Sequence, residues 1–451
     1  MKIFIPNDVK FIINTLYENN FEGFMVGGCV RDSLLNILPK DYDITTSAKP
    51  EETLSLFDKT IPTGLKHGTI TVLINNVPYE VTTYRSEGEY LDNRRPSSVE
   101  FVSNIKEDLS RRDFTINALA YNDKLGLIDY FNGIDDLSNK LIRCVGDPDT
   151  RFKEDALRML RAIRFSCQLD FTIESTTFDA IIKNSKLINN ISKERIRDEL
   201  CKILISNNPS QGIRLLQSSG ILCEILPHIN SLVGFSPLSV GHNKNIFEHT
   251  LKVINNTHND LFLRLAALFH DVGKLKTLTL ESDGIYRFPN HNIEGAIMTK
   301  DILRDLRFDN HTINCVYKLI EHHLLLKPFY MPTRYEVKKL LTYMGNDLIY
   351  LLFDIQSADI RSLNNPEPFL KKVTYTKNEV TDILSKNEPL YIKDLNITGN
   401  DLITNFNING KLIGLTLNYL LDKVLENPTL NNTEYLLKLA YEFINKQIKK
   451  V

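Results

Sequence analysis

The pattern of hydrophobic and polar positions changes near residue 146. Up to that point a helical opening is followed by short runs rich in β-branched and aromatic residues, such as TITVLINNVPYEVTTYR, separated by Gly, Pro and Asn. After Gly146, Asp147 and Pro148 the apolar positions recur at helical spacing, and strand-like runs almost disappear. We therefore expect a multidomain α+β protein, in which an α/β module precedes an all-α remainder.

The length of the chain agrees with several domains. Its 451 residues exceed the usual size of one hydrophobic core and fit two to four domains. Polar and proline-containing breaks near 207–209, 236–237 and 364–368 divide the helical part further. We predict a catalytic head at 1–146, a helical neck at 147–225, a helical body at 226–365 and a helical tail at 366–451.

Composition narrows the class of protein. The chain is 42% hydrophobic and 24% charged, without an apolar run near the roughly 20 residues that span a bilayer. Its start lacks the features of a secretory signal, so we predict a cytoplasmic protein without membrane contact. The six cysteines form no C-x-x-C pair and are expected to be reduced thiols. With a net charge of -2, any surface for nucleic acid must be a local patch.

The first group of chemically informative residues lies in FMVGGCVRDSLLNILPKDYDIT. A short apolar strand precedes Gly27 and Gly28, and a helix is expected to begin near Cys29. Paired glycines let a ligand approach the backbone, and the first turn of a helix offers free N–H groups to a phosphate. The segment therefore predicts a triphosphate-binding turn.

Two aspartates follow this turn in D-x-D spacing. If Asp41 and Asp43 lie on a strand, they point to the same face and can bind the same hard cations through oxygen. Glu80, in the expected strand PYEVTTYR, is the natural third carboxylate for a site with two Mg²⁺ ions. Taken alone, a D-x-D pair is more often two surface aspartates beside a turn.

The combination of strand, Gly-Gly turn, Arg31-Asp32 helix start and D-x-D resembles the polymerase-beta-type nucleotidyltransferases. Within that superfamily, VGGCVRDSLLNILPKDYDITTSA is similar to the head of tRNA nucleotidyltransferases and bacterial poly(A) polymerases. The resemblance extends to RRDFTINALAY, and it implies that residues of this run hold the triphosphate and sugar of a nucleotide: Arg111, Arg112, Asp113 and Asn117. The alternative is a charged helix start capped by Asp113.

The segment RFKEDALRMLRAIRF predicts one helix. On it Asp155 and Arg158 share a face, and Arg161 and Arg164 continue the row. Cytosine and adenine both present an amino donor beside a ring-nitrogen acceptor, so one carboxylate and one guanidinium can accept these two bases and reject guanine and uracil. The E-D-x-x-R pattern resembles the signature of the class that contains bacterial tRNA nucleotidyltransferases, where such residues read the base. The alternative is an ion pair on a solvated surface.

A polar stretch, SEGEYLDNRRPSSVEF, lies between the two head motifs and contains Arg94, Arg95 and Pro96. By resemblance, the equivalent region is a mobile loop associated with the final addition of A. Its presence favours an enzyme that adds A over one restricted to C.

Histidines and aspartates gather in the helical half. His249, the pair His270-Asp271 and Asp359 resemble the HD superfamily of metal-dependent phosphohydrolases, and these side chains suit a divalent transition metal or Mg²⁺. The resemblance implies that these four residues are metal ligands. A second metal site would use His291 and one of two neighbours, His322 or His323. The alternative is a structural body without activity, and Leu324 departs from the Asp that family members often carry there.

The tail, with LYIKDLNITGNDLI and IGLTLNYLLDKVLENPTLNN, resembles the C-terminal part of tRNA nucleotidyltransferases with a fused HD domain, which implies that it binds the tRNA body. The alternative for the tail is helix-bundle packing alone. The resemblance covers nearly the whole chain. It implies template-independent addition of C, C and A from CTP and ATP to the 3′ end of tRNA, with two Mg²⁺ ions in the head and no DNA partner. One alternative is a poly(A) polymerase or an A-only transferase. Alternatives of other classes are an HD phosphohydrolase with an RNA-binding head and a non-catalytic RNA-binding protein.

Overall fold

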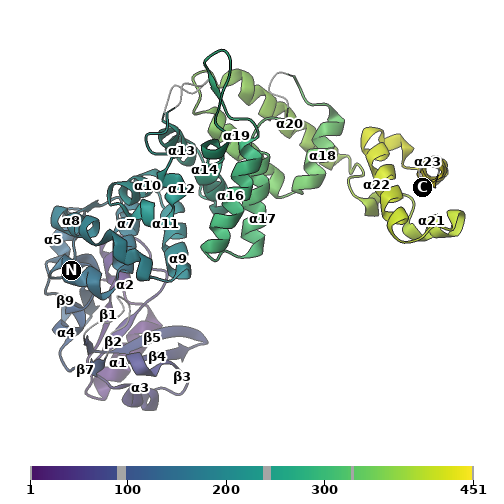
Figure 1. Cartoon of the computed structure of the whole chain (residues 1–451). Coiled ribbons are helices and arrows are strands. Elements are labelled where there is room, and N and C mark those ends of the chain that lie inside the picture. Colours follow the sequence, from purple (N-terminus) through teal and green to yellow (C-terminus); the bar gives the residue numbers. More distant parts are fainter. Residues whose placement is uncertain (1–2, 89–97, 237–244, 327–329, 449–451) are drawn as a thin grey trace. The chain divides into compact units, whose positions relative to one another are not determined.

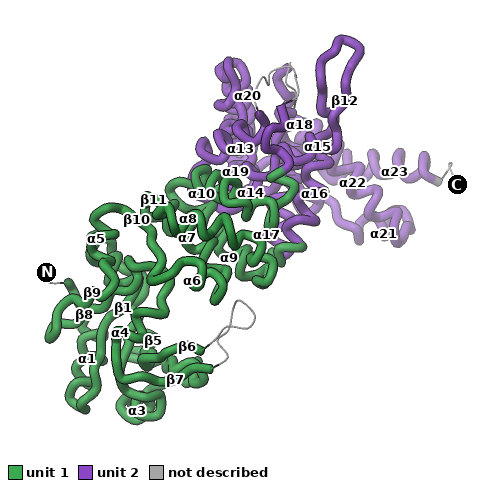
Figure 2. Tube along the Cα trace, turned by 60° about the vertical axis from the view of Figure 1, so that its left-hand side comes forward, with its two compact units in different colours: residues 1–230, 305–308 green, residues 231–304, 309–451 purple. Residues whose placement is uncertain are grey.

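The computed structural model (Figure 1) describes residues 3–88, 98–236, 245–326 and 330–448. Arg94, Arg95 and Pro96 of the predicted loop lie outside the described residues. The chain forms two compact units, coloured in Figure 2: unit 1 comprises residues 1–230 and 305–308, and unit 2 comprises 231–304 and 309–451. The finer division into four domains stays a prediction.

The N-terminal part of unit 1 is built on a seven-stranded mixed sheet. Its strand order is β3-β4-β5-β2-β1-β8-β9, and only the β2–β5 pairing is parallel among these described strands. The strands are β1 (Gly23–Val26), β2 (Ile44–Thr46), β3 (Thr60–Gly64), β4 (Thr69–Ile74), β5 (Val77–Thr83), β8 (Leu119–Asn122) and β9 (Gly126–Asp129). The helices of this part are α1 (Asn7–Glu18), α2 (Gly28–Leu34), α3 (Pro50–Leu56), α4 (Ile105–Ser110) and α5 (Gly133–Ser138).

Helix α1 packs on the sheet through one apolar face. Its buried residues recur at the spacing of three and four that places side chains on one side of a helix: Val9, Ile12, Ile13 and Leu16. A side chain at Gly23 would place its Cβ 2.9 Å from Leu16 Cδ1, so glycine lets α1 approach β1 without displacing the Leu16 side chain. A buried cluster that includes Phe24, Val26 and Tyr84 forms part of the hydrophobic core of this part of unit 1.

The remaining helices of unit 1 gather at one end of it (Figure 1). They are α6 (Pro148–Glu154), α7 (Leu157–Leu169), α8 (Ser175–Asn184), α9 (Lys193–Leu204), α10 (Pro209–Ser218), α11 (Ile221–Ile225) and α12 (Pro227–Asn230). Short two-stranded pairs accompany the sheet and these helices: β6 (Arg85–Glu87) with β7 (Val99–Phe101), and β10 (Leu141–Ile142) with β11 (Thr172–Ile173). The predicted change from an α/β module to helices near residue 146 is confirmed.

The predicted single helix over 151–165 is wrong. Helix α6 ends at Glu154 and α7 begins at Leu157, because the backbone of Asp155 is extended, with φ −137° and ψ 103°. The Asp155 carboxylate accepts a hydrogen bond from the backbone N–H of Leu157 at 3.1 Å. Asp155 therefore caps the second helix from outside it, as short acidic side chains often do.

Unit 2 is helical apart from one short hairpin, β12 (Thr279–Leu280) with β13 (Tyr286–Arg287), among its described residues. Its helices are α13 (Ile246–Asn255), α14 (Leu261–Phe269), α15 (Lys274–Thr277), α16 (His291–Asp305), α17 (Asn310–Glu321), α18 (Arg334–Met344), α19 (Leu348–Ile360), α20 (Glu367–Ser385), α21 (Gly399–Phe406), α22 (Lys411–Glu426) and α23 (Thr433–Ile448). Helix α14 begins where the Asp260 side chain accepts from the Leu263 N–H, and its buried residues pack against α13, α17 and α19.

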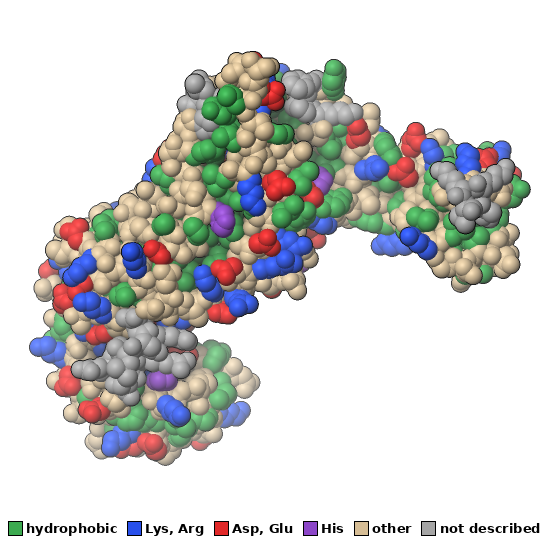
Figure 3. Space-filling view, in the orientation of Figure 1, with side chains coloured by type: hydrophobic (Ala, Val, Ile, Leu, Met, Phe, Trp, Pro, Cys, Tyr) green, Lys and Arg blue, Asp and Glu red, His purple; other side chains and the backbone are tan. Residues whose placement is uncertain are grey.

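The described helices give no evidence of a membrane span, since none combines sufficient length with sufficient apolar character to cross a bilayer. Basic and acidic side chains are interspersed over the face drawn in Figure 3. Any attraction for a polyanion on this face must therefore come from local groups of cations.

Candidate active site

The turn between β1 and α2 has the predicted strand–turn–helix form. Gly27 takes φ 76°, a conformation that favours glycine, and precedes the first residue of α2, Gly28. A Cβ at Gly27 would lie 2.9 Å from Nη1 of Arg112. The bare backbone at this position therefore makes room for the Arg112 guanidinium.

Asp41 and Asp43 lie just before β2 rather than within it. The Asp43 carbonyl accepts from the Val26 N–H at 3.0 Å, which fixes its backbone against β1. Because Ile44 of β2 is paired in parallel with Val81 of β5, the preceding residues, Asp43 and Glu80, are neighbours across the two strands. The D-x-D pair and Glu80 therefore converge, although only the two aspartates line the adjacent cavity.

Electrostatics at this cluster favours a cation. Desolvation raises the pKa of Asp43, Glu80 and Asp41 raise it further by repulsion, and the Arg112 guanidinium opposes them. A carboxylate whose charge is destabilised by burial and by like-charged neighbours is stabilised when a divalent cation binds beside it. The oxygen donors present thus fit Mg²⁺.

A cavity of about 480 Å³ adjoins the aspartates. It is lined by Gly27, Gly28, Cys29, Arg31, Asp32, Ile37, Leu38, Lys40, Asp41, Asp43, Arg112, Asp113, Asn117, Arg161, Arg164, Phe165 and Gln168. A lining that holds both carboxylates and arginines suits a ligand that carries both metal ions and phosphates. Most of the nucleotide-binding residues predicted from the sequence therefore meet in one cavity.

Four of these residues form a continuous chain of hydrogen bonds. Arg31 Nη1 donates to Asn117 Oδ1 at 2.6 Å, and Asn117 Nδ2 donates to Asp113 Oδ1 at 3.2 Å. Arg161 Nε donates to Asp113 Oδ2 at 2.7 Å. Burial alone would raise the pKa of Asp113, but the Arg161 guanidinium outweighs it and lowers the pKa to about 2. Asp113 is therefore an ionised anchor rather than a helix cap.

The two adjacent arginines of the RRD motif have different surroundings. Arg112 lines the cavity, and its Nε is buried without a hydrogen-bond partner among the described residues. Such a donor is available to an anion. Both arginines donate to Asp108, Arg111 at 2.7 Å and Arg112 at 3.4 Å. Arg111 also donates to Glu87 at 3.3 Å, and it does not line the cavity.

The predicted base-reading pair, Asp155 and Arg158, also lies outside the cavity lining. Arg158 Nη1 donates to Glu154 at 2.6 Å, and its Nη2 donates to the Arg111 carbonyl at 3.0 Å. The Asp155 carboxylate receives hydrogen bonds from Arg195 at 2.8 and 3.3 Å. Both side chains are thus held in place by other residues rather than by each other.

Sequence reasoning missed Arg195 and Phe165. Arg195 lies on α9, and a single sequence gives no signal for its contact with Asp155. The Phe165 ring lies under three guanidinium groups, those of Arg31, Arg161 and Arg164, at 5.0, 5.4 and 4.0 Å from its centroid. An aromatic face attracts cations, so Phe165 holds these arginines at the cavity. The sequence signal that could have identified Phe165 is its position one turn after Arg161 in an arginine-rich helix.

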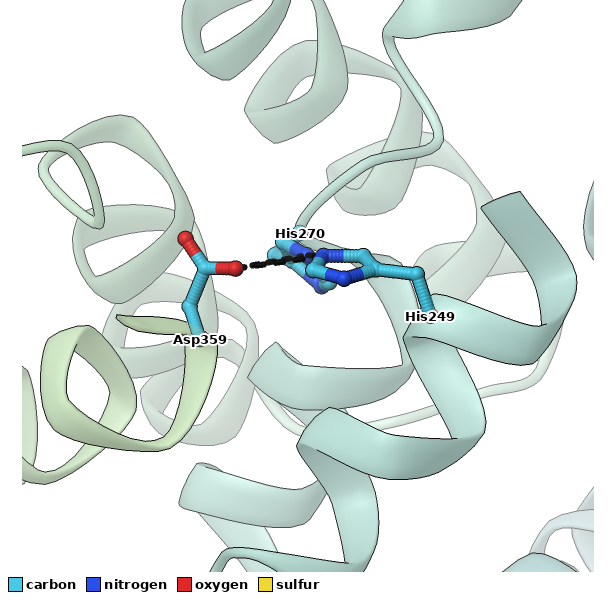
Figure 4. Close-up of side chains that lie close together, drawn as sticks. All are labelled: His249, His270 and Asp359. Carbon is cyan, nitrogen blue, oxygen red and sulfur yellow. Dashed lines mark hydrogen bonds and ion pairs between the residues drawn. The ribbon is translucent and has the colours of Figure 1, made fainter. Parts of the chain in front are cut away.

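Unit 2 brings together a separate group of ligand-type side chains. His249 of α13 and His270 at the end of α14 approach through their Nε2 atoms, 3.1 Å apart. Asp359 of α19 faces them, with Oδ1 3.1 Å from His249 Nε2 (Figure 4). Asp271 Oδ2 lies 3.4 and 3.3 Å from the same two imidazole nitrogens. The four ligands predicted from the HD resemblance are therefore adjacent.

The three remaining candidate ligands, His291, His322 and His323, do not share one environment. Asp271, His291 and His323 form a second group with atoms within 4.8 Å of each other. Desolvation, with repulsion from neighbouring histidines, lowers the pKa of His323 to about 3, so its ring is neutral at ordinary pH. The His322 ring instead packs against the tilted ring of Tyr343, with centroids 4.7 Å apart, and lies outside both groups.

Three families match successive parts of the chain. The Poly A polymerase head domain matches residues 23–143. The family described as probable RNA and SrmB-binding site of polymerase A matches residues 170–232. The HD domain matches residues 246–345. These matches cover the carboxylate cluster and most of the histidine cluster.

Relatives extend the similarity to the whole chain. A CCA-adding enzyme from Ligilactobacillus salivarius (strain UCC118) is 34% identical over 461 residues, which cover 98% of this chain and 99% of that protein. The chain belongs to the CCA-adding enzyme family. Another member, from Lactobacillus helveticus (strain DPC 4571), is 52% identical over 204 residues, which cover 45% of this chain and 51% of that protein.

Solved CCA-adding enzymes share the fold. The Bacillus stearothermophilus enzyme, solved in complex with CTP, matches with a TM-score of 0.74 and 25% identity, over 99% of this chain and 100% of that one. The Thermotoga maritima enzyme, solved with tRNA, matches with a TM-score of 0.61 and 23% identity, over 98% and 100% of the two chains. The predicted family and fold class are confirmed, and this CCA-adding family member is a nucleotidyltransferase.

Proposed function

We propose that the cavity of unit 1 adds C, C and A from CTP and ATP to the 3′ end of tRNA, without a template. The observation that carries this proposal is the meeting of Asp41, Asp43 and Arg112 in one cavity beside Glu80. Carboxylates there would hold Mg²⁺, and the unpaired Nε of Arg112 is available to a phosphate oxygen.

The reaction is a displacement at phosphorus. The 3′ hydroxyl oxygen of the RNA forms a bond to the α-phosphorus of the nucleotide, while the bond from that phosphorus to the β-phosphate oxygen breaks. Pyrophosphate leaves, and the hydroxyl proton passes to water. Two Mg²⁺ ions held by Asp41, Asp43 and Glu80 would stabilise the attacking and leaving oxygens.

The remaining cavity residues would position the nucleotide. Arg112 and the amides after Gly27 would contact the triphosphate, and Asn117 and Asp113 would contact the ribose. Because Asp113 is bonded to Arg161 and Asn117 to Arg31, each sugar-binding group keeps a fixed orientation. Rigid donors and acceptors lower the entropy cost of aligning the α-phosphorus with the incoming hydroxyl.

Discrimination between bases is assigned to Asp155 and Arg158. Asp155 would accept the amino group of cytosine or adenine, and Arg158 would donate to the adjacent ring nitrogen. Uracil and guanine present the opposite polarity and would leave both groups unpaired. Support comes from the way Arg195 and Glu154 hold the two side chains.

The test uses purified protein, Mg²⁺ and tRNAs that end before C, after C and after CC. CTP and ATP are supplied separately. We expect two additions from CTP and one from ATP, the latter only on the tRNA that ends in CC. Asp43→Ala should abolish every addition, whereas the exposed Asp58→Ala should leave them intact.

Other outcomes would identify one of the alternative functions. Repeated addition of A to any RNA end would indicate a poly(A) polymerase, and addition of A alone to tRNA ending in CC would indicate an A-only transferase. Normal extension by Asp43→Ala would reject the assignment of the metal site.

A second candidate function belongs to unit 2. His270 Nδ1 is bonded to the Ala267 carbonyl at 2.9 Å, and His249 Nδ1 lies 2.9 Å from the Ser362 hydroxyl. Fixing Nδ1 in this way directs Nε2 towards a metal, an arrangement common to metal-bound histidines. The observation favours a metal-dependent phosphohydrolase over an inactive structural body.

Hydrolysis of p-nitrophenyl phosphate with Mn²⁺, Ni²⁺ or Mg²⁺ tests this second activity. We expect turnover that is lost in His270→Ala, while that variant still extends tRNA. Equal turnover in His270→Ala would show that the phosphatase activity comes from elsewhere.

A further inference from the structure

Asp108 is a buried carboxylate of unit 1 that has no part in the reaction described above. It lies in the first turn of α4, and its side chain is fully buried. A carboxylate inside a protein stays ionised only where partners stabilise its charge. Desolvation would raise the pKa of Asp108, but the guanidiniums of Arg112 and Arg111 outweigh it and lower the pKa. Asp108 is therefore a negative charge fixed in the interior.

The two oxygens of Asp108 have different partners. Oδ1 accepts from the Arg111 guanidinium at 2.7 and 3.1 Å and from the Arg85 backbone N–H of β6 at 3.4 Å. Oδ2 accepts from the Thr45 hydroxyl of β2 at 3.3 Å and from Arg112 Nη2 at 3.4 Å. Partners from three segments of the chain thus hold the carboxylate in one orientation, with Oδ2 directed to Arg112.

The orientation of Arg112 depends on this carboxylate. Among the described residues, Asp108 is the one acidic side chain that forms an ion pair with Arg112. A guanidinium is planar and its donors keep a fixed arrangement, so holding Nη2 also fixes the direction of Nε. This Nε is buried without a partner in the part of the chain that the structure describes, and Arg112 lines the cavity. Asp108 therefore holds one end of the guanidinium and leaves Nε available to an anion.

We propose that Asp108 is a positioning residue for nucleotide binding, which holds Arg112 so that its guanidinium meets a phosphate of the nucleotide. Arg111 holds Asp108 and does not contact the nucleotide itself. The proposal rests on the nucleotide site proposed above for unit 1, and it adds the residues that orient the phosphate-binding arginine of that site.

The sign of the effect distinguishes positioning from simple electrostatics. A triphosphate is anionic, so removing a nearby negative charge should strengthen its binding by Coulomb attraction alone. Removing a positioning carboxylate has the opposite effect, because ordering the released Arg112 against a phosphate costs binding free energy. Asp43 also attracts the Arg112 guanidinium, so without Asp108 the arginine is drawn towards another carboxylate.

The experiment measures the affinity of the full-length protein for CTP with Mg²⁺ and without tRNA, by isothermal titration calorimetry. Asp108→Asn keeps the size of the side chain and removes its charge. We expect a roughly tenfold higher Kd for CTP, as for the loss of one hydrogen bond to a charged group. Glu107→Gln is the matched control, because the neighbouring carboxylate is exposed and its loss should leave the Kd unchanged.

A double-mutant cycle tests whether Asp108 acts through Arg112. In an Arg112→Met background, Asp108→Asn should cause no further rise in the Kd for CTP, because no guanidinium remains to be positioned. The KM for tRNA should not change in Asp108→Asn, and circular dichroism checks the fold of each variant.

If Asp108→Asn does not fold, Arg111→Met provides a second cycle, since it removes the contacts to Oδ1. Positioning predicts that the effect of Arg111→Met on the Kd disappears in the Arg112→Met background. Direct contact between Arg111 and a phosphate predicts that the two effects add, which would overturn the proposal.

Other results also decide against the positioning role. An unchanged or lower Kd in folded Asp108→Asn overturns it, and so does an equal rise of the Kd in Glu107→Gln or in the Arg112→Met background. A parent protein that binds no CTP rejects the proposed nucleotide site and the positioning role together. A parent that binds CTP, with equal binding by Asp108→Asn, rejects the positioning role alone.

Discussion

Arg195 controls the position of the carboxylate that is assigned to base recognition. Its Nη1 and Nη2 donate to the two oxygens of Asp155 at 3.3 and 2.8 Å, from a position 40 residues further along the chain. The two side chains are 28% and 18% exposed, so the pair contributes about 1 kcal/mol, as surface ion pairs do, and not the larger value of a buried pair.

Arg195→Met keeps the apolar stem and removes the guanidinium. The Asp155 carboxylate then keeps its hydrogen bond from the Leu157 N–H but loses both contacts with the guanidinium, and ordering it against a base costs about 1 kcal/mol. This cost corresponds to a roughly fivefold lower kcat/KM for CTP and ATP. UTP and GTP make no productive contact with the carboxylate, so their kcat/KM should not fall, and selectivity decreases by the same factor.

The assay is steady-state kcat/KM for all four nucleotides on tRNAs ending before C and after CC. Arg197→Met is the matched control, because Arg197 lies on the same helix and bonds Asp198 at 2.7 Å instead of Asp155. An unchanged CTP to UTP ratio in Arg195→Met would refute the reasoning, and so would an equal change in Arg197→Met.

Three further predictions concern unit 1. Asp43→Asn should lower kcat roughly a thousandfold, because a lost metal ligand removes several kcal/mol of transition-state stabilisation, with the fold checked by circular dichroism. Asp113→Asn should lower the free energy of unfolding by about 2 kcal/mol at pH 7, which corresponds to the lowering of its pKa from 3.8 to about 2. Because the pKa of Asp113 is lower in the folded than in the unfolded protein, this stabilisation is present above about pH 4 and is lost as the pH falls towards 2. Urea denaturation at several pH values measures this loss. Gly27→Ala should raise KM for nucleotides by displacing Arg112, whereas Gly126→Ala, also at positive φ but with open space around it, should change stability alone.

The sequence was sufficient where function depends on a short local pattern. The glycine turn after β1 was predicted because an apolar strand, Gly27 and a helix start follow one another directly. The His270-Asp271 pair was found in the same way. In both cases the residues that act together are close in the chain, or belong to a pattern that carries its own chemistry.

The sequence was insufficient where contacts between distant segments determine where a helix ends or where a side chain lies. Apolar periodicity continues through Asp155, so it predicted one helix and missed the break that the Asp155 side chain stabilises. Arg111 and Arg112 are adjacent and chemically identical, and both donate to Asp108. The additional contact of Arg111 with Glu87 distinguishes it from Arg112, which lines the cavity. Likewise, His322 and His323 differ only in the direction that the end of α17 gives to each.

The hydrogen-bonded chain from Arg31 through Asn117 and Asp113 to Arg161 sets a limit on dissecting this protein. A fragment cut at residue 146 would retain all three carboxylates that are proposed to hold Mg²⁺, yet Arg161 would be missing and the buried Asp113 would lose its counterion. The excised head would thus carry a carboxylate that is costly to keep ionised, in the part of the cavity where the sugar is expected. The proposed nucleotide site is therefore a joint property of the sheet and the first helices after it, and the smallest autonomous fragment must extend through α7.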